Sequence, residues 1–242
     1  MDLKNKRALI TGASKGMGAA IARGLVSEGI KIFLTARDEE FLKRLTSELS
    51  RQGADVNFAL ADLADDLQLE KMFARGLEFL GGIDILINNA GIGIKGSVAS
   101  MDIADWDKMF AVNLRAAFLL ARLAAREMMQ QKSGCIINVG SGASQTPIAG
   151  YAGYCATKYG LLGFSESLGL ELREHNIKVS IIMPGSTATY FGGGSPDDKT
   201  MSKPGILRPK DVADSVLYLL KQSDIAWTSV MNLRPLNLKK AH

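Results

Sequence analysis

The sequence has few of the side chains that bind metal ions or form disulfide bonds. Its two cysteines, Cys135 and Cys155, lie far apart and lack metal-ligand spacing. Two thiols so placed are typical of a reduced, cytoplasmic protein, and we expect that location. The two histidines, His175 and His242, do not form a ligand pair either, so we predict no metal site.

The sequence also lacks long apolar runs and a strong charge of one sign. No run approaches the roughly 20 apolar residues that a membrane-spanning helix needs, and the N-terminal residues contain no apolar segment of a signal peptide. The net charge of +4 is modest and spread along the chain, which favours a solvated surface over a nucleic-acid interface. We therefore expect neither a membrane nor a nucleic acid as a partner.

Strand-like and helical segments alternate along most of the chain. The expected strands cover residues 7–11, 30–35, 54–60, 83–87, 135–139, 177–183 and 226–233. Helical patterns lie between them and include residues 39–50, 65–80, 103–110, 113–131 and 211–221. Such alternation predicts right-handed βαβ crossovers and a parallel sheet. We predict a single α/β domain over residues 1–242.

A glycine-rich loop follows the first expected strand. Gly12, Gly16 and Gly18 are arranged as G-x-x-x-G-x-G before a helical pattern. Glycines permit positive φ and close backbone approach, and a helix N-terminus offers free N–H groups to an anion. The spacing differs from the G-x-G-x-x-G of the common dinucleotide fingerprint, and such a loop can also be a plain tight turn. Its place after the first strand favours a phosphate-binding turn.

The end of the second expected strand bears on the choice between two dinucleotides. In dinucleotide-binding folds this position meets the adenosine ribose, where an acid suits a free 2′-hydroxyl and an arginine suits a 2′-phosphate. Here Ala36 and Arg37 follow the strand, and Lys15 lies in the glycine loop. The two cations favour NADP(H) over NAD(H). Asp38 is evidence for NAD(H), but we interpret it as the N-cap of the next helix.

Polar residues and glycines follow two further strands. Asn88-Asn89-Ala90-Gly91 follows the fourth strand, and Ser141 follows the strand at 135–139. In an open α/β sheet, ligands bind beyond the carboxyl ends of the strands, so both segments should border the same crevice as the glycine loop. The Asn-Asn-Ala-Gly segment could also be an ordinary turn.

Tyr154 and Lys158 lie four residues apart at the start of a long helical pattern that runs to Arg173. Residues with this spacing share one face of a helix. A phenol beside an ammonium can act in acid–base chemistry, because the positive charge lowers the pKa of the phenol. An isolated pair of this kind is more often an ordinary surface pair, so the interpretation depends on the rest of the site.

A loop rich in glycine, proline, serine and threonine covers residues 186–209, with Tyr190 and Phe191 as its large apolar residues. A loop of this length inside a compact domain is either functional or disordered. We prefer a lid that covers the substrate and carries most of the substrate specificity.

Together, these segments resemble the short-chain dehydrogenase/reductase family, and the resemblance covers nearly the whole chain. The motifs occur in the order of that family: Thr11-Gly12-x-x-x-Gly16-x-Gly18, Asn88-Asn89-Ala90-Gly91, Asn113, Ser141, Tyr154-x-x-x-Lys158 and Pro184-Gly185. Ser141 precedes Tyr154 by thirteen residues, as is usual in the family. The resemblance implies a Rossmann-type, doubly wound domain with a mostly parallel, seven-stranded sheet and helices on both faces.

The resemblance also implies which residues form the site. The catalytic residues would be Ser141, Tyr154, Lys158 and Asn113. The residues expected to contact NADP(H) are Gly12, Ser14, Lys15, Gly16, Met17, Gly18, Arg37, Asp62, Asn89, Ala90, Gly91, Tyr154, Lys158, Pro184, Gly185, Thr187 and Thr189.

The implied reaction transfers a hydride between the nicotinamide of NADP(H) and a small-molecule ketone or secondary alcohol. Tyr154 would exchange a proton with the substrate oxygen, which Ser141 would hold by a hydrogen bond. Lys158 would lower the pKa of Tyr154 and bind the nicotinamide ribose, and Asn113 would hold a water that links Lys158 to solvent. The resemblance runs towards bacterial 3-oxoacyl-(acyl-carrier-protein) reductases and relatives that act on small ketones or sugars.

Several alternatives stay open. A cofactor-binding regulator of the same fold would not need the intact Ser141, Tyr154 and Lys158. An epimerase or dehydratase of the superfamily usually has a different glycine spacing and a longer C-terminal region. The Tyr154 helix is the usual dimer surface of the family, so we expect a homodimer or a homotetramer. Residues 232–240 lack the glycine-rich end of many members, which leaves the choice between the two open.

Overall fold

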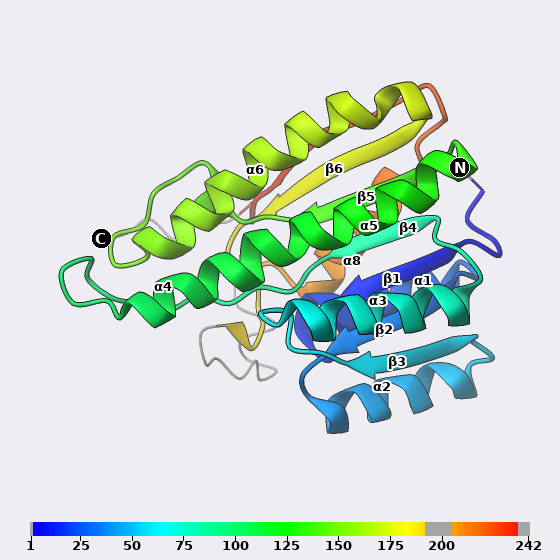
Figure 1. Cartoon of the computed structure of the whole chain (residues 1–242), viewed down its shortest axis with the longest axis horizontal. Helices are drawn as coiled ribbons and strands as arrows, with labels where there is room; N and C mark the ends of the chain where they lie inside the picture. The colour runs from blue at the N-terminus through cyan, green and yellow to red at the C-terminus, as the bar shows by residue number, and fades with distance from the viewer. Residues whose placement is uncertain (1, 192–204, 237–242) are drawn as a thin grey trace.

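A sheet of seven parallel strands crosses the computed structural model, which describes residues 2–191 and 205–236 (Figure 1). The strands are adjacent in the order β3-β2-β1-β4-β5-β6-β7. Their bounds are β1 (Arg7–Thr11), β2 (Lys31–Ala36), β3 (Val56–Leu60), β4 (Ile85–Asn88), β5 (Gly134–Val139), β6 (Ile177–Pro184) and β7 (Val230–Leu233). All six pairings are parallel, so the carboxyl ends of the strands meet at one edge of the sheet.

Helices connect the strands as the alternating sequence pattern predicts. Their bounds are α1 (Gly16–Ser27), α2 (Glu39–Arg51), α3 (Asp66–Leu80), α4 (Ile103–Phe110), the π-helical turn η1 (Ala111–Arg115), α5 (Ala116–Gln131), α6 (Ala152–Leu172) and α8 (Pro209–Lys221). Two short 3₁₀ turns, η2 (Gly142–Ser144) and η3 (Arg173–His175), complete the described part. No helix in these two described stretches is both long enough and apolar enough to cross a bilayer.

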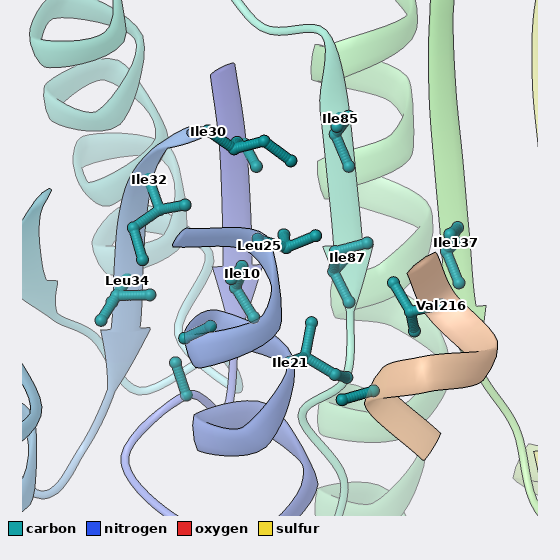
Figure 2. Packing of buried hydrophobic residues seen from close by; sticks show 14 of the residues in the cluster. Ile10, Ile21, Leu25, Ile30, Ile32, Leu34, Ile85, Ile87, Ile137 and Val216 are labelled. Atoms are coloured by element: carbon teal, nitrogen blue, oxygen red, sulfur yellow. The ribbon is translucent and has the colours of Figure 1, made fainter. Parts of the chain in front are cut away.

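The strands bury apolar side chains on both faces. Ile10, Ile32 and Ile87 pack against α1, α2 and α8, as Figure 2 shows for part of this cluster. The alternate residues, such as Leu9 and Phe33, pack against α3, α5 and α6 on the other face. Burial on both faces explains why the strands are continuous apolar runs and not alternating ones. The predicted doubly wound architecture is confirmed.

Local signals in the sequence set several helix ends. The carboxylate of Asp38 accepts a hydrogen bond from Phe41 N at 3.3 Å, which confirms its predicted role as the N-cap of α2. Gly81 ends α3 with φ = 74°, a left-handed conformation that favours glycine.

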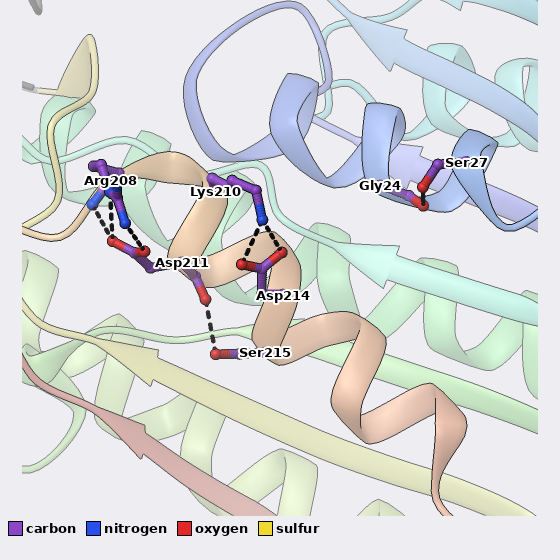
Figure 3. A network of polar contacts seen from close by, with 7 residues as sticks. All are labelled: Gly24, Ser27, Arg208, Lys210, Asp211, Asp214 and Ser215. Carbon is purple, nitrogen blue, oxygen red and sulfur yellow. Dashed lines mark hydrogen bonds and ion pairs between the residues drawn. The ribbon is translucent and has the colours of Figure 1, made fainter.

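Polar side chains also secure the start of α8, which lies beside α1 (Figure 3). Arg208 and Asp211 form reciprocal hydrogen bonds around its first turn, and Lys210 ion-pairs with Asp214 at 2.7 Å. Pro209 is the first helical residue, where the missing N–H costs no intrahelical bond.

Several expected boundaries differ from the structure. The helix expected at 103–110 is confirmed, but the one expected at 113–131 begins at Ala116, and the π-helical turn η1, which contains Asn113, joins the two. The strands β3 and β4 begin at Val56 and Ile85, each two residues later than expected. The last strand begins at Val230 and not at residue 226. Before it, the indole of Trp227 donates to Val179 O at 2.7 Å and Ser180 Oγ donates to Thr228 O at 2.7 Å, so side-chain bonds replace regular strand pairing there.

Candidate functional site

A cleft of about 1400 Å³ lies at the edge of the sheet where the strands end. It is bordered by the loops that follow all seven strands and by the first turns of α6. Most of the residues that the sequence predicts for the site line it: Gly12, Ser14, Lys15, Gly16, Met17, Arg37, Asp62, Asn89, Ala90, Gly91, Ser141, Tyr154, Lys158, Pro184, Gly185, Thr187 and Thr189. Two predicted residues, Gly18 and Asn113, do not.

The glycine loop has the backbone that an anion site needs. Gly12 and Gly16 have φ of 61° and 60°, and a Cβ on Gly12 would stand 2.8 Å from Ala90 Cα. α1 begins without a side-chain cap and without an acid in its first turn. Its first N–H groups therefore have no side-chain acceptor from the N-cap residue and can bind a phosphate group. Gly18 has a packing role, because a Cβ there would overlap Gly12 O.

Thr11 and Asn89 fasten the glycine loop to the loop after β4. Thr11 Oγ1 accepts from Asn89 N and Ala90 N, both at 3.0 Å. The Asn89 amide donates in return to Thr11 O at 2.9 Å and to Gly12 O at 3.0 Å. Both Asn89 amide hydrogens are thus used in holding the loop, and its buried Oδ1 has no hydrogen-bond partner among the described residues. Thr11 was not predicted as a site residue, although a polar residue at the end of an apolar strand is a signal for one.

Lys15 lines the end of the cleft that lies beside α2. Its ammonium lies 5.0 Å from the ring centroids of Phe41 and Tyr190 and 3.9 Å from Asp38 Oδ2. Asp38 therefore caps α2 and also offsets part of the charge of Lys15. Arg37, the residue before Asp38, lines the cleft as predicted.

Tyr154 and Lys158 lie one turn apart on α6, and both are buried, at 8% and 3% exposure. The ammonium of Lys158 donates to Val139 O at 2.9 Å and stands 5.9 Å from the centroid of the Tyr154 ring. Burial lowers the pKa of Lys158 to about 8. Burial also raises the pKa of Tyr154, and the hydrogen bond from Ser141 opposes this effect in part.

The prediction that Lys158 lowers the pKa of Tyr154 is therefore not met in this structure. Desolvation disfavours the phenolate more than the hydrogen bond from Ser141 favours it. The ammonium, for its part, lies over the tyrosine ring and is hydrogen-bonded to Val139 O.

Ser141 is oriented by the 3₁₀ turn that follows β5. Its hydroxyl oxygen accepts from Ala143 N at 3.1 Å, and Ser144 Oγ accepts from Ser141 N at 3.2 Å. With its acceptor side engaged by Ala143, the Ser141 hydroxyl can donate its proton towards Tyr154 and into the cleft.

Asn113 lies behind the cleft, with 1% of its surface exposed. Its amide donates to Ile92 O at 2.8 Å and to Thr157 Oγ1 at 3.0 Å, and its oxygen accepts from Ile92 N at 2.8 Å. A Cβ on Gly91 would be 3.4 Å from Asn113 Oδ1 and 3.5 Å from Lys158 Nζ, so the two side chains approach the same glycine. The contacts seen here position the loop after β4 against α6.

The end of the cleft beyond Tyr154 has an apolar wall. The Phe191 ring lies 5.3 Å from the Tyr154 ring, and the Tyr151 ring lies 6.3 Å from it on another side. Of the predicted lid, residues 192–204 lie outside the described residues. Several residues that line the cleft were not predicted as site residues, among them Ile92, Tyr151, Phe191, Ile206 and Arg234.

Known proteins resemble this chain over most of its length. A 2,3-dihydro-2,3-dihydroxybenzoate dehydrogenase of Bacillus subtilis is 34% identical over 234 residues, which cover 90% of each chain. A 3-oxoacyl-(acyl-carrier-protein) reductase of Salmonella typhimurium is 35% identical, over 82% of this chain and 80% of its own. The crystal structure of a metagenomic short-chain oxidoreductase in complex with NADP has 37% identity and a TM-score of 0.85, and it covers 99% of this chain and 100% of its own.

The family model described as short chain dehydrogenase matches residues 6–199, which include all of the loops after β1 to β5 and the start of α6. This match spans the glycine loop, Ser141, Tyr154 and Lys158. The chain belongs to the short chain dehydrogenase family.

Proposed function

We propose that this chain is an NADPH-dependent carbonyl reductase, which reduces a ketone or, in reverse, oxidises a secondary alcohol. One observation carries the proposal. Ser141, Tyr154 and Lys158 come from two separate segments and border the same cleft, where the Ser141 hydroxyl is near enough to the Tyr154 phenol to act against the rise in its pKa. A hydroxyl and a phenol that can both reach one oxygen atom suit a carbonyl whose oxygen gains negative charge.

When bound, the nicotinamide cofactor supplies or accepts the hydride. The chain supplies the proton: the Tyr154 hydroxyl donates it to the substrate oxygen during reduction and removes it from the alcohol during oxidation. Ser141 donates a hydrogen bond to the same oxygen. Because burial raises the pKa of Tyr154, the phenol is protonated at neutral pH, which is the form that reduction requires.

Lys158 and Asn113 support Tyr154 in this proposal. The Lys158 ammonium lies at the floor of the cleft, where it can bind the ribose hydroxyls of a cofactor and transmit a proton. Asn113 holds Gly91 and Ile92 against α6 and so determines how much space is left beside the ammonium of Lys158. A water held near Asn113 and linking Lys158 to solvent remains part of the proposal.

NADP(H) is the proposed cofactor because two cations stand at the adenosine end. Lys15 is held between two aromatic rings, and Arg37 borders the same part of the cleft. Both charges suit a 2′-phosphate, while Asp38 weakens the preference. The diphosphate would lie on the N-terminus of α1, and the other proposed contacts are Asp62, Asn89, Ala90, Gly91, Pro184, Gly185, Thr187 and Thr189.

A substrate of the 3-oxoacyl type is supported by the similarity to a 3-oxoacyl-(acyl-carrier-protein) reductase. The dehydrogenase relative from Bacillus subtilis acts, by its name, on a cyclic dihydrodiol, so the family likeness alone leaves several substrate shapes. Residues 186–209 would cover the substrate as a lid. Its described part includes Phe191, whose ring packs on Tyr154.

We also propose that the cytoplasmic enzyme is a homo-oligomer. A groove on α4, η1, α5 and α6 is lined by apolar side chains, and two of them, Trp106 and Phe118, are 38% and 46% exposed. Aromatic residues that gather on one face are typical of a protein interface. A second copy of this chain, with its own groove packed against this one, would bury Trp106 and Phe118.

The experiment follows the absorbance of NADPH while a panel of ketones, aldehydes and acyl thioesters is added. We expect Tyr154→Phe to bind NADPH as tightly as the wild type and to lose turnover by about 10²–10⁴-fold. Tyr151→Phe is the matched control, since Tyr151 borders the same cleft and packs on Tyr154. Near-normal turnover by Tyr154→Phe would contradict the mechanism. Tight NADPH binding without turnover of any carbonyl would favour a cofactor-binding regulator.

A further inference from the structure

Arg234 lies at the substrate end of the cleft. β7 ends at Leu233, whose carbonyl oxygen accepts from Gly185 N at 2.8 Å, and this bond holds the next residue beside the loop after β6. The guanidinium reaches the loop after β5, where a Cβ on Gly142 would overlap Arg234 Nη1. Gly142 directly follows Ser141, so the cation stands against the same short turn that carries the hydroxyl proposed to hold the reacting oxygen.

In the described part of the chain, no acid offsets the charge of Arg234. Within residues 2–191 and 205–236, no carboxylate forms an ion pair with it, and its closest polar side-chain contact there is a long one, 3.5 Å to Asn232 Oδ1. Some arginines of this chain do ion-pair with acids, such as Arg7 and Arg23, at 2.8 and 2.6 Å. The planar guanidinium of Arg234 therefore has donors left for a ligand.

The acids of the cleft lie at its opposite end. Asp38 and Asp62 follow β2 and β3, and the cations Lys15 and Arg37 stand beside them. The loop after β5, which the guanidinium reaches, is three strands from β2 and two from β1, which is roughly 10–14 Å at about 4.8 Å per strand. One phosphate group cannot contact both ends, so Arg234 and the adenosine-end cations bind different anions.

Apolar side chains, among them Ile148, Tyr151, Phe191 and Ile206, also line the cleft. Arg234 itself is exposed, so a substrate can reach its guanidinium from solvent. The guanidinium fork matches the two oxygens of a carboxylate, with which it forms paired hydrogen bonds.

We propose that Arg234 binds a carboxylate of the substrate. The substrate would then be an oxo acid, or the corresponding hydroxy acid in the reverse direction. The carboxylate would lie within a few bonds of the reacting carbonyl, because Gly142 is adjacent to Ser141. This inference rests on the proposed carbonyl reductase. It names a free oxo acid as the substrate in place of a 3-oxoacyl thioester, which has no carboxylate, and Arg234 as a specificity-determining residue.

The first test compares each small oxo acid with its methyl ester, using acetoacetate and laevulinate with NADPH. The two members of a pair share the ketone and differ in the charge. We expect the wild type to favour the acid and Arg234→Met to lower kcat/KM for the acid by about tenfold or more, the effect of one charge-assisted hydrogen bond. Turnover of the ester should stay within about twofold, and Arg234→Lys should retain part of the preference. Arg75→Met, at an exposed site on α3, is the control.

The second test needs no turnover. It records thermal unfolding of the NADPH-saturated protein with 3-hydroxybutyrate or 4-hydroxyvalerate, which cannot react with the reduced cofactor. We expect each hydroxy acid to raise Tm in the wild type and in Arg75→Met, and to leave Tm unchanged in Arg234→Met.

The two proposals fail in different ways. If the enzyme reduces ketones through Tyr154, treats acid and ester alike and gains no stability from a hydroxy acid, the role of Arg234 is overturned and the reductase remains. If no carbonyl is reduced, the reductase is contradicted, and the shift in Tm still decides whether Arg234 binds the carboxylate.

Discussion

The ammonium of Lys158 donates a hydrogen bond to the backbone oxygen of Val139, 2.9 Å away. Val139 is the last residue of β5, so this bond ties α6 to the edge of the sheet immediately before the loop of Ser141. The ammonium is buried by this arrangement, and burial lowers its pKa to about 8. The site therefore holds a cation that is costly to keep charged in the folded protein.

This cost should be visible in the pH dependence of stability. Between pH 8 and 10.5 the unfolded chain keeps the proton on Lys158 while the folded chain loses it. The unfolded state then binds more protons, so the contribution of this group to stability rises with pH in that window. Below pH 8 the penalty is fully present, at roughly 3 kcal/mol for a pKa difference of this size.

We expect Lys158→Met to remove that dependence. Relative to the wild type, the free energy of unfolding of the variant should be highest at pH 7 and should fall as the pH rises from 8 to 10.5. Urea unfolding at several pH values measures the difference, in which the titration of Tyr154 and Cys135 largely cancels. Lys71→Met, at an exposed site on α3, is the control and should show a flat difference. A flat difference for Lys158→Met as well would mean that the buried ammonium retains its ordinary pKa.

The hydrogen bonds that Thr11 Oγ1 accepts from the loop after β4 should contribute strongly to stability. Thr11→Val keeps the shape of the side chain but leaves the N–H groups of Asn89 and Ala90 without their acceptor. Each unpaired donor costs about 1–3 kcal/mol, so we expect a loss of several kcal/mol in the free energy of unfolding, together with weaker NADPH binding.

Thr35→Val is the matched control for Thr11→Val. Thr35 is also a buried strand threonine, but its hydroxyl has no hydrogen-bond partner among the described residues. Its replacement by valine should be neutral or stabilising. Equal destabilisation by the two variants in chemical unfolding would show that the Thr11 hydrogen bonds are unimportant.

The choice of cofactor should respond in opposite directions to two substitutions that lie 3.9 Å apart. Lys15→Ala removes a cation and should weaken NADPH binding by about tenfold while NADH binding changes little, which corresponds to roughly 1.4 kcal/mol. Asp38→Asn removes the opposing charge and should strengthen NADPH binding several-fold. Asparagine is as good an N-cap as aspartate, so α2 is retained.

Fluorescence titration at low and high salt measures these affinities. The two groups are more than a third exposed, so both effects should shrink as salt screens the charges. An unchanged ratio of NADPH to NADH affinity in both variants would place the 2′-phosphate away from Lys15.

The sequence predicts the fold well because its signals are local. Every expected strand is present as a largely apolar run, and Asp38 and Gly81 mark helix ends by short-range chemistry. The start of β7 was missed because the side chains of Trp227 and Ser180 satisfy backbone oxygens that a longer strand would otherwise pair. Such bonds leave no periodic signal.

The site was only partly predictable, because burial and distant contacts decide its chemistry. The spacing of Tyr154 and Lys158 places a cation near a phenol, but it does not reveal that desolvation raises the pKa of Tyr154. The rings of Phe41 and Tyr190 meet around Lys15 from segments far apart in the chain. Arg234 had a weak signal, since it follows the last strand where many family members have glycine.

The exposed aromatic groove should control assembly. Phe118 on α5 packs edge-on against Phe164 of α6 at 5.9 Å and remains 46% exposed, so a partner copy would bury it. Phe118→Glu would place a charge in that apolar contact, and we expect light scattering at micromolar concentration to show a shift from oligomer to monomer. Leu67→Glu is the matched control, because Leu67 on α3 is 68% exposed and lies outside the groove. If the wild type is already monomeric, or if both variants assemble like the wild type, the groove is not the interface.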